Sequence, residues 1–395
     1  MAANPPETLT ARVLDLVASG QATSRTDLAR QLGAAPSTVS TTVAQLIAHG
    51  LLADAGVQAT PSGRPRKTLR IGGADEYALA AELGSRHARI GIVRPGAVRE
   101  AVTTTPFDIT AGPVAALDAL ADSMQALADS AHGSLRAIGL ALPGPVDLET
   151  GGVDSPSRMP GWHGYPVREH LSSRFGITAI VGNDANLMAV GEDAAHRCEH
   201  RHSVTVKAGT AIGAGIIIDG RLHRGATDAA GDISHVRVDA GGEIPCACGN
   251  VGCLETVASG AALQRILTEQ GLSVGSTQDV VALVQDGEPL ASQVVRRAGG
   301  YLGEVLSANV NFFNPDVVYL GGLLSTLEPF VAAVRSRLYE RCHPLMTQQL
   351  SIERTVLGAD AGLVGAGLQG LQQALAATLE SLEGGVGTNR RSSHV

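Results

Sequence analysis

Apolar residues recur at helical spacing in the first fifty positions and predict three short helices. The first covers residues 9–17. The second is capped by Ser24 or Thr26 and ends at Gly33. The third, after a short turn, covers residues 37–49. This is the spacing of a helix-turn-helix, with the third helix as the recognition helix.

The third helix also has a polar face of short hydroxyl and amide side chains, which can enter a major groove and bond phosphates or base edges. The candidates for DNA contact on it are Ser37, Thr38, Ser40, Thr41, Thr42 and Gln45. A basic Gly-Arg-Pro tip follows at residues 63–67, before a predicted strand at residues 68–71. Such a tip is slim, rigid and cationic, and it fits a narrow minor groove. Its candidates for DNA contact are Arg64, Arg66 and Lys67.

Charge is divided unequally along the chain. Residues 1–72 hold seven basic and four acidic side chains, a net charge of +3. Because the net charge of the whole chain is −8, the remaining residues carry −11. An acidic body repels nucleic acid, and any DNA contact therefore belongs to the front segment. Three helices with a solvated basic loop would also suit a protein-docking module. The basic tip, placed directly after the third helix, favours DNA binding.

From residue 77 onward the hydrophobic pattern changes to strands that alternate with helices. We expect a strand hairpin over residues 77–83 and 89–94, a helix over 113–131, and later strands at 137–142, 178–181, 203–207, 215–219 and 317–320. Polar or glycine-rich loops follow several of these strands, including Asn183-Asp184 and residues 209–214. Each loop alone reads as a plain turn or a helix cap. Two α/β halves that flank a cleft would bring such loops together, because ligands bind at strand ends.

Length and composition limit the class of protein. A chain of 395 residues is expected to form two or three domains. We divide it into a DNA-binding domain at residues 1–72, an effector and oligomerisation domain at 73–383, and a disordered tail at 384–395. No run approaches about 18 apolar residues, so we expect no membrane span. The first residues lack the layout of a secretory signal, and with reduced cysteines this indicates the cytoplasm.

Three of the five cysteines lie within eight residues, shortly after a histidine. A Cys-x-Cys pair is too cramped to form a disulfide easily, whereas thiolates and an imidazole suit one tetrahedral zinc ion. Buried unpaired cysteines are the alternative, but Gly249 and Gly252 let the backbone fold round an ion. Four ligands leave no open position for water, so the predicted zinc is structural. The predicted ligands are His235, Cys246, Cys248 and Cys253.

Four groups of residues follow one another along the chain. They are Asn183-Asp184, the Gly209-Thr210 loop, Gly231-Asp-Ile-Ser-His235, and the cysteines that precede Glu255. Here the chain resembles the ROK family of repressors, open reading frames and sugar kinases, whose fold is a two-lobed actin-like, sugar-kinase fold of the α/β class. The resemblance covers about residues 77–377, and the front domain matches the repressor branch with its winged helix-turn-helix. It implies zinc at the four ligands above. It also implies sugar binding by Gly144, Ser157, Asn183, Asp184, Asp232, His235 and Glu255.

Departures from the family pattern separate a repressor from a kinase. The kinases open with Asp-x-Gly-Gly-Thr, whereas this chain has Glu82-Leu-Gly-Ser-Arg-His87. Ala211 stands where a glycine is usual in the second phosphate loop, and Asp232 and Ser234 replace a glutamate and a glycine. Asp184, the base in the kinases, is retained, but a kinase also needs a phosphate cradle and magnesium. These departures favour a regulator without kinase activity.

We therefore expect a sugar-responsive transcriptional regulator, most simply a repressor of carbohydrate genes. It would bind a palindromic operator as a homodimer or homotetramer, and its effector would be a sugar or sugar phosphate. One alternative is an ATP-dependent hexose kinase with a DNA-binding appendage, in which Asp184 is catalytic. Another is a scaffold whose winged helix docks to a protein.

Overall fold

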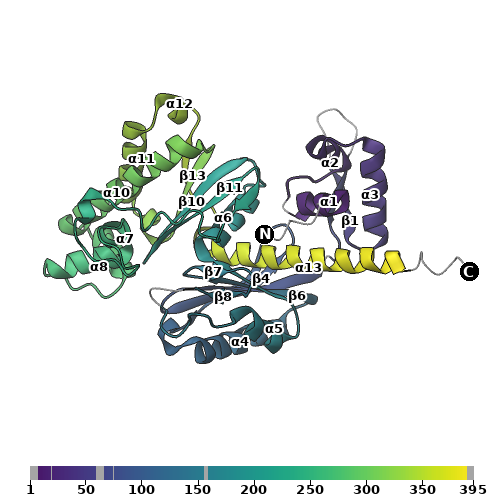
Figure 1. Cartoon of the computed structure of the whole chain (residues 1–395), viewed down its shortest axis with the longest axis horizontal. Helices are drawn as coiled ribbons and strands as arrows, with labels where there is room; N and C mark the ends of the chain where they lie inside the picture. The colour runs from purple at the N-terminus through teal and green to yellow at the C-terminus, as the bar shows by residue number, and fades with distance from the viewer. Residues whose placement is uncertain (1–7, 19, 59–65, 74, 155–158, 389–395) are drawn as a thin grey trace, which may run out of the picture.

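The computed structural model describes residues 8–18, 20–58, 66–73, 75–154 and 159–388. Figure 1 shows a small N-terminal unit beside two larger α/β lobes, with one long C-terminal helix running from between the lobes to beneath the small unit. No helix in the described part of the chain is long and apolar enough to cross a membrane.

The N-terminal unit is a winged helix. Ser24 caps the second helix by accepting a hydrogen bond from the Asp27 amide, and Gly33 ends it in the left-handed conformation at φ 60°. The wing is an antiparallel pair whose second strand begins at Arg66, two residues earlier than predicted. The elements are α1 Leu9–Ala18, α2 Arg25–Leu32, α3 Pro36–Ala48, β1 Leu52–Gln58 and β2 Arg66–Ile71. The three predicted helices are confirmed.

The first lobe contains a five-stranded sheet in the order β5-β4-β3-β6-β9. Its hairpin is antiparallel, and β3, β6 and β9 are parallel. One face packs against α4 and α5 around the fully buried Trp162. The bounds are β3 Glu76–Leu83, β4 His87–Arg94, β5 Val98–Pro106, α4 Pro113–Ser130, β6 Ser134–Leu142, β7 Val146–Asp147, β8 Gly152–Val153, α5 Val167–Phe175, β9 Ala179–Asn183 and α6 Asp184–Ala195.

The second lobe repeats the strand plan of the first, in the order β12-β11-β10-β13-β14 and with the same directions. Its β11 begins at Ile212 rather than at Gly215, so the connector after β10 is only residues 209–211. The bounds are β10 His202–Ala208, β11 Ile212–Ile218, β12 Arg221–His223, α7 Glu255–Ala258, α8 Gly260–Glu269, α9 Thr277–Gln285, α10 Pro289–Phe313, β13 Val317–Gly321, α11 Glu328–Arg341, α12 Pro344–Thr347 and β14 Ser351–Arg354.

Helices α6 and α13, the latter spanning Ala361–Thr388, lie between the two sheets. They approach each other closely because glycines face the crossing: a Cβ at Gly365 would lie 1.8 Å from the carbonyl oxygen of Leu187, and one at Gly191 would lie 2.1 Å from that of Ala361. Further along α13, Leu379 is buried in the core of the winged helix. The helix continues to Thr388, into the predicted tail, and residues 389–395 lie outside the described part.

The winged helix and the body enclose a cavity of about 420 Å³. Side chains of α1, α6 and α13 line it, including Leu14, Asp193 and Gln369. Protein interiors are otherwise close-packed. The contact between the DNA-binding unit and the body therefore leaves open space at this place.

Candidate ligand and metal site

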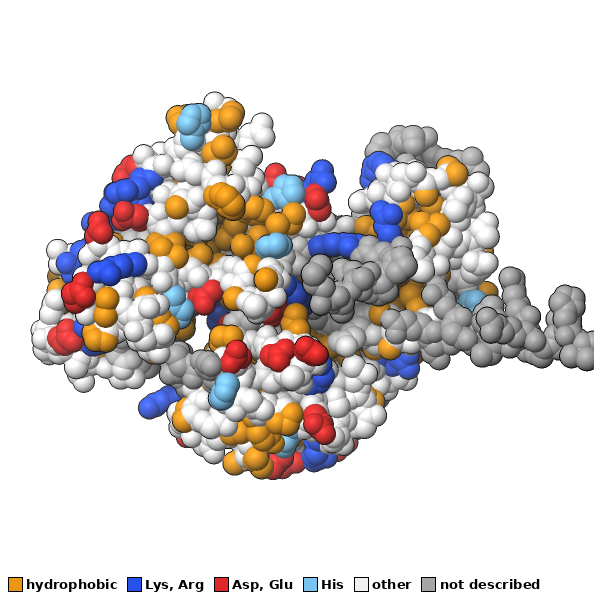
Figure 2. All heavy atoms as spheres, in the orientation of Figure 1, with side chains coloured by type: hydrophobic (Ala, Val, Ile, Leu, Met, Phe, Trp, Pro, Cys, Tyr) orange, Lys and Arg blue, Asp and Glu red, His pale blue; other side chains and the backbone are white. Residues whose placement is uncertain are grey.

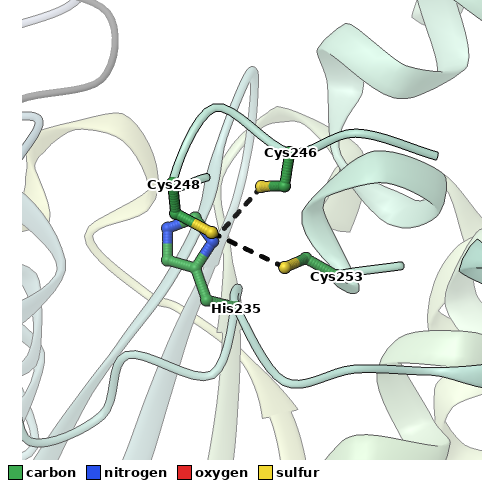
Figure 3. Close-up of side chains that lie close together, drawn as sticks. All are labelled: His235, Cys246, Cys248 and Cys253. Carbon is green, nitrogen blue, oxygen red and sulfur yellow. Dashed lines mark hydrogen bonds between the residues drawn. The ribbon is translucent and has the colours of Figure 1, made fainter. Parts of the chain in front are cut away.

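A histidine and three cysteines converge in the second lobe, on the segment that joins β12 to α7 (Figure 3). Their ligand atoms all lie within 4.8 Å of one another. The Cys246 Sγ is 3.4 Å from the His235 Nδ1, and the Cys248 Sγ is 3.7 Å from the Cys253 Sγ. Gly249, at φ 90°, permits the turn between the cysteines. These residues form a four-ligand group that can hold a metal ion.

The electrostatics of this group favour a cation. Burial, together with the neighbouring Cys248 and Cys246 thiols, raises the pKa of Cys253 to about 12. Several thiolates so close together repel one another, and a bound divalent ion removes this cost because a coordinating thiol is deprotonated outright.

The loops next to this group are joined to strand β11. Glu255, at the start of α7 and directly after Cys253 and Leu254, is buried and accepts a 2.9 Å hydrogen bond from the Ile212 amide. Its own amide donates to the carbonyl of Ser234. The Ser234 hydroxyl donates to the exposed Asp232 at 2.8 Å. The sulfur cluster thus lies beside two of the predicted sugar-binding carboxylates.

Asn183 and Asp184 lie at the junction of β9 and α6, in the first lobe. The Asn183 side chain caps α6 by accepting from the amides of Ala185 and Asn186, and it donates to the Gly144 carbonyl at 3.1 Å. A Cβ at Gly213 would lie 2.9 Å from that of Ala185, so this junction also packs against β11. Strand β11 therefore contacts predicted sugar-binding segments of both lobes. Ser157 lies outside the described residues.

Lys207 is a functional candidate that the sequence reasoning missed. Its Nζ lies 2.5 Å from Glu82 Oε1 and 2.7 Å from Asp184 Oδ2, which joins the two lobes by an ion pair. The signal was available in the sequence: a lysine near the end of a strand that is otherwise uncharged from Ser203 to Ala208 requires a charged partner if it is buried. Figure 2 shows acidic side chains on the lower lobe along the line where the lobes meet.

The two loops that the sequence predicted to correspond to phosphate loops in the kinases are held by internal contacts. The Gly84 amide donates to the His87 carbonyl at 2.8 Å, and a Cβ at Gly84 would lie 2.8 Å from the His87 ring. Burial is the main cause that lowers the pKa of His87. In the second loop the Thr210 hydroxyl lies 3.1 Å from that of Thr277.

On the recognition helix α3, most of the predicted DNA-contacting side chains are exposed. They are Ser37, Thr38, Ser40, Thr41 and Gln45. Thr42 differs from the prediction: it is buried, and its hydroxyl donates to the Thr38 carbonyl at 3.1 Å, because its position falls on the apolar side of the helix. Lys67 is exposed in the wing and pairs with Asp54 at 3.6 Å. Arg64 and the side chain of Arg66 lie outside the described part.

The models of two known families match separate stretches of the chain. The model of the ROK family matches residues 79–371, and that of the IclR helix-turn-helix domain matches residues 10–55. The DNA-binding transcriptional dual regulator NagC of Escherichia coli K12 is 30% identical over 372 residues, which cover 88% of this chain and 90% of NagC. The counterpart of Shigella flexneri, with the same identity and coverage, is named N-acetylglucosamine repressor.

Solved structures include both regulators and kinases. A ROK family transcriptional regulator, a homolog of the E. coli MLC protein, superposes with a TM-score of 0.73 at 27% identity and covers 93% of this chain and 95% of its own. A ROK family glucokinase from Streptomyces griseus, in complex with glucose and AMPPNP, has a TM-score of 0.63 at 26% identity. It covers 75% of this chain and 98% of its own, so the part it leaves uncovered is large enough to hold the winged helix.

Proposed function

This chain belongs to the ROK family and is one of its DNA-binding transcriptional regulators, and we propose that a sugar bound between its two lobes controls its affinity for an operator. The observation that carries the proposal is that β11 contacts Ala185, the residue that follows Asn183-Asp184 in one lobe, and is bonded to Glu255 in the other. A ligand held by both segments binds one arrangement of the lobes better than another, and only such a difference can shift an equilibrium.

The chemistry of these side chains suits a sugar. Carboxylates and amides accept and donate hydrogen bonds to neighbouring hydroxyl groups. The sugar-binding set in this proposal is Gly144, Ser157, Asn183, Asp184, Asp232, His235 and Glu255. Relatives named for N-acetylglucosamine, and a solved structure with bound glucose, make these two sugars the first to test.

We further propose that the metal held by His235 and the three cysteines is zinc, in a structural role. Three thiolates and an imidazole are the soft, tetrahedral donor set that zinc prefers. The bound ion would fix the ends of the loop that carries Asp232 and Glu255. It would therefore support the sugar site without contacting the sugar.

The winged helix would bind DNA through two surfaces, the polar face of α3 and the basic wing. Ser37, Thr38, Ser40, Thr41 and Gln45 of α3 would face the major groove, and Arg64, Arg66 and Lys67 of the wing would face the minor groove or the phosphates. A palindromic operator requires an even number of chains, so we propose a homodimer or homotetramer. We place it in the cytoplasm, where a bacterial operator is accessible.

The kinase alternative rests on one observation, the retention of Asp184 at the mouth of α6. Against it, the Gly84 amide and the Thr210 hydroxyl are already engaged within the protein, which leaves fewer groups to cradle phosphates. A kinase would phosphorylate glucose with ATP, and the Asp184→Asn variant would lose that activity. We expect no phosphorylation by the unmodified chain.

The deciding experiment uses the zinc-loaded full chain and an operator selected from random DNA. Its affinity is measured by fluorescence anisotropy with and without glucose and N-acetylglucosamine. We expect one sugar to change operator affinity by about tenfold, a coupling of ~1.4 kcal/mol. A chain that lacks residues 1–72 should still be stabilised by that sugar but should not bind the operator. DNA binding by the truncated chain, or an operator affinity that neither sugar changes, would contradict the proposal.

A further inference from the structure

An ion pair between the lobes includes Asp184, one of the residues of the proposed sugar site. Lys207 is the second-last residue of β10, before Ala208. Its ammonium group lies between Glu82 of β3 and Asp184 of α6. All three side chains are largely buried, with exposed fractions of 22% for the lysine and 12% and 14% for the two carboxylates. Water therefore screens this interaction only weakly.

The internal repeat explains why Glu82 and Lys207 meet. Both residues are the second-last of the central strand of their sheet, and each pairs with an antiparallel neighbour on one side and a parallel neighbour on the other. The repeat thus places an acidic side chain in one lobe opposite a basic one in the other. Equivalent positions of the two halves form the contact.

The two carboxylates keep the lysine charged. Burial alone would lower the pKa of Lys207, but the charges of Asp184 and Glu82 outweigh this effect and raise its pKa above the usual value. The ammonium group is therefore charged at neutral pH. Without the ammonium group the two carboxylates would repel each other, because one oxygen of each lies within hydrogen-bonding distance of the position of the Lys207 Nζ.

Both carboxylate oxygens of Asp184 already accept a hydrogen bond within the protein, and each keeps a lone pair that can accept from a sugar hydroxyl. Its Oδ1 accepts a 2.8 Å hydrogen bond from the Ala185 amide, and its Oδ2 accepts from Lys207. Phosphoryl transfer requires a general base that can take a proton and a divalent ion that neutralises the phosphates. A positive charge already fills the space between the carboxylates, and it brings no open coordination position.

We propose that Lys207 is a built-in cation that takes the place of a divalent metal ion between Glu82 and Asp184. As a consequence, the site binds its ligand but does not bind a nucleotide with its metal ion. The inference deepens the proposed function and rests on it only for the identity of the ligand as a sugar. The placement of the cation is independent of DNA binding.

The test is a titration of Mn²⁺ into the zinc-loaded full chain and its Lys207→Met variant, followed by calorimetry and by the electron spin resonance of free Mn²⁺. Removal of the ammonium group leaves two buried carboxylates, which are the ligands that such ions bind. We expect the variant to bind one Mn²⁺ at least about tenfold more tightly than the unmodified chain, and its Tm to rise with Mn²⁺.

Two further variants make the result specific. Lys207→Arg keeps the cation and should bind no more Mn²⁺ than the unmodified chain. The double variant Lys207→Met with Glu82→Gln removes one carboxylate and should lose the new site. A Lys207→Met variant that folds but binds Mn²⁺ no better than the unmodified chain overturns the proposal.

A measurement on the unmodified chain covers the case in which Lys207→Met does not fold. Titration with Mn²⁺ and with Mg²⁺–AMPPNP should give no binding below about 1 mM. If the unmodified chain binds either ligand and the Asp184→Asn variant does not, the proposal that Lys207 takes the place of the metal ion is wrong. Failure of the sugar to change operator affinity would leave these titrations unaffected, so the two proposals can fail separately.

Discussion

The side chain of Gln21, in the turn before α2, donates a 3.2 Å hydrogen bond to the carbonyl of Gly220 in the turn between β11 and β12. This contact joins the DNA-binding unit to the turn after β11, the strand that contacts the proposed sugar-binding segments of both lobes. The second link between the two is α13, whose Leu379 is buried in the core of the winged helix. A cavity of about 420 Å³ lies between these links. The Gln21–Gly220 contact is therefore a route by which a movement of the turn after β11 would reach the winged helix.

We expect Gln21→Ala to weaken the communication between sugar and operator. The variant keeps both sites, so each ligand alone should bind with nearly unchanged affinity. The coupling free energy between sugar and operator, expected at ~1.4 kcal/mol, should fall by about 0.5–1 kcal/mol. Anisotropy titrations with and without sugar measure this coupling. Gln31→Ala is the matched control, since the Gln31 side chain bonds the Gln21 carbonyl within the winged helix and does not reach the body.

Replacement of Cys248 by serine should remove the metal. Cys248 is an exposed member of the cluster, so the loss of its thiol alters little packing. We expect the bound zinc to fall from one equivalent to near zero and the Tm to fall by about 10 °C, because the energy of structural metal binding is folding energy. Elemental analysis and thermal denaturation measure the two effects. Cys198→Ser should retain full zinc, and equal zinc in both variants would refute the four-ligand site.

Gln45→Ala should change which operator sequences the protein prefers. Gln45 is exposed on α3, and an amide can form two hydrogen bonds to an adenine edge. We expect a loss of about 1–3 kcal/mol on the preferred operator and a smaller loss on unrelated DNA. By contrast, Lys67→Ala should weaken binding to all sequences and reduce the salt dependence by about one counterion. Identical losses on every sequence for both variants would exclude base reading by Gln45.

The stability of the body should depend on pH through Glu192 of α6. Its fully buried carboxylate accepts hydrogen bonds from the Val356 and Leu357 amides at 2.6 and 3.3 Å, and burial raises its pKa above 4.5 despite them. A carboxyl group with a raised folded pKa favours the protonated form, so it loses stability as pH rises through that range. Glu192→Gln keeps an acceptor oxygen and does not titrate. As the pH rises from acidic values toward neutrality, urea denaturation should show the free energy of unfolding of Glu192→Gln rise relative to that of the unmodified chain. A constant difference would contradict this.

Local sequence signals predicted the elements of the winged helix well. The cap at Ser24, the glycine at position 33 and the apolar spacing of α3 act within a few residues, and such interactions appear directly in the sequence. The misplacement of Thr42 on the DNA-facing side has the same local origin. The Thr42 hydroxyl donates its hydrogen bond to the carbonyl four residues earlier, inside the helix, so it needs no contact with water. The polar residue type therefore did not ensure an exposed position.

The sequence by itself determined the alternation of strands and helices and the His235 and cysteine spacing, because periodicity and metal-ligand spacing are short-range properties. Only the tertiary structure decided that Lys207 lies between Glu82 and Asp184, residues 125 and 23 positions away. It also decided that α13 passes from the sheets into the winged helix. Such contacts depend on how two repeated lobes fold against each other, and packing between distant segments has no local pattern in the chain.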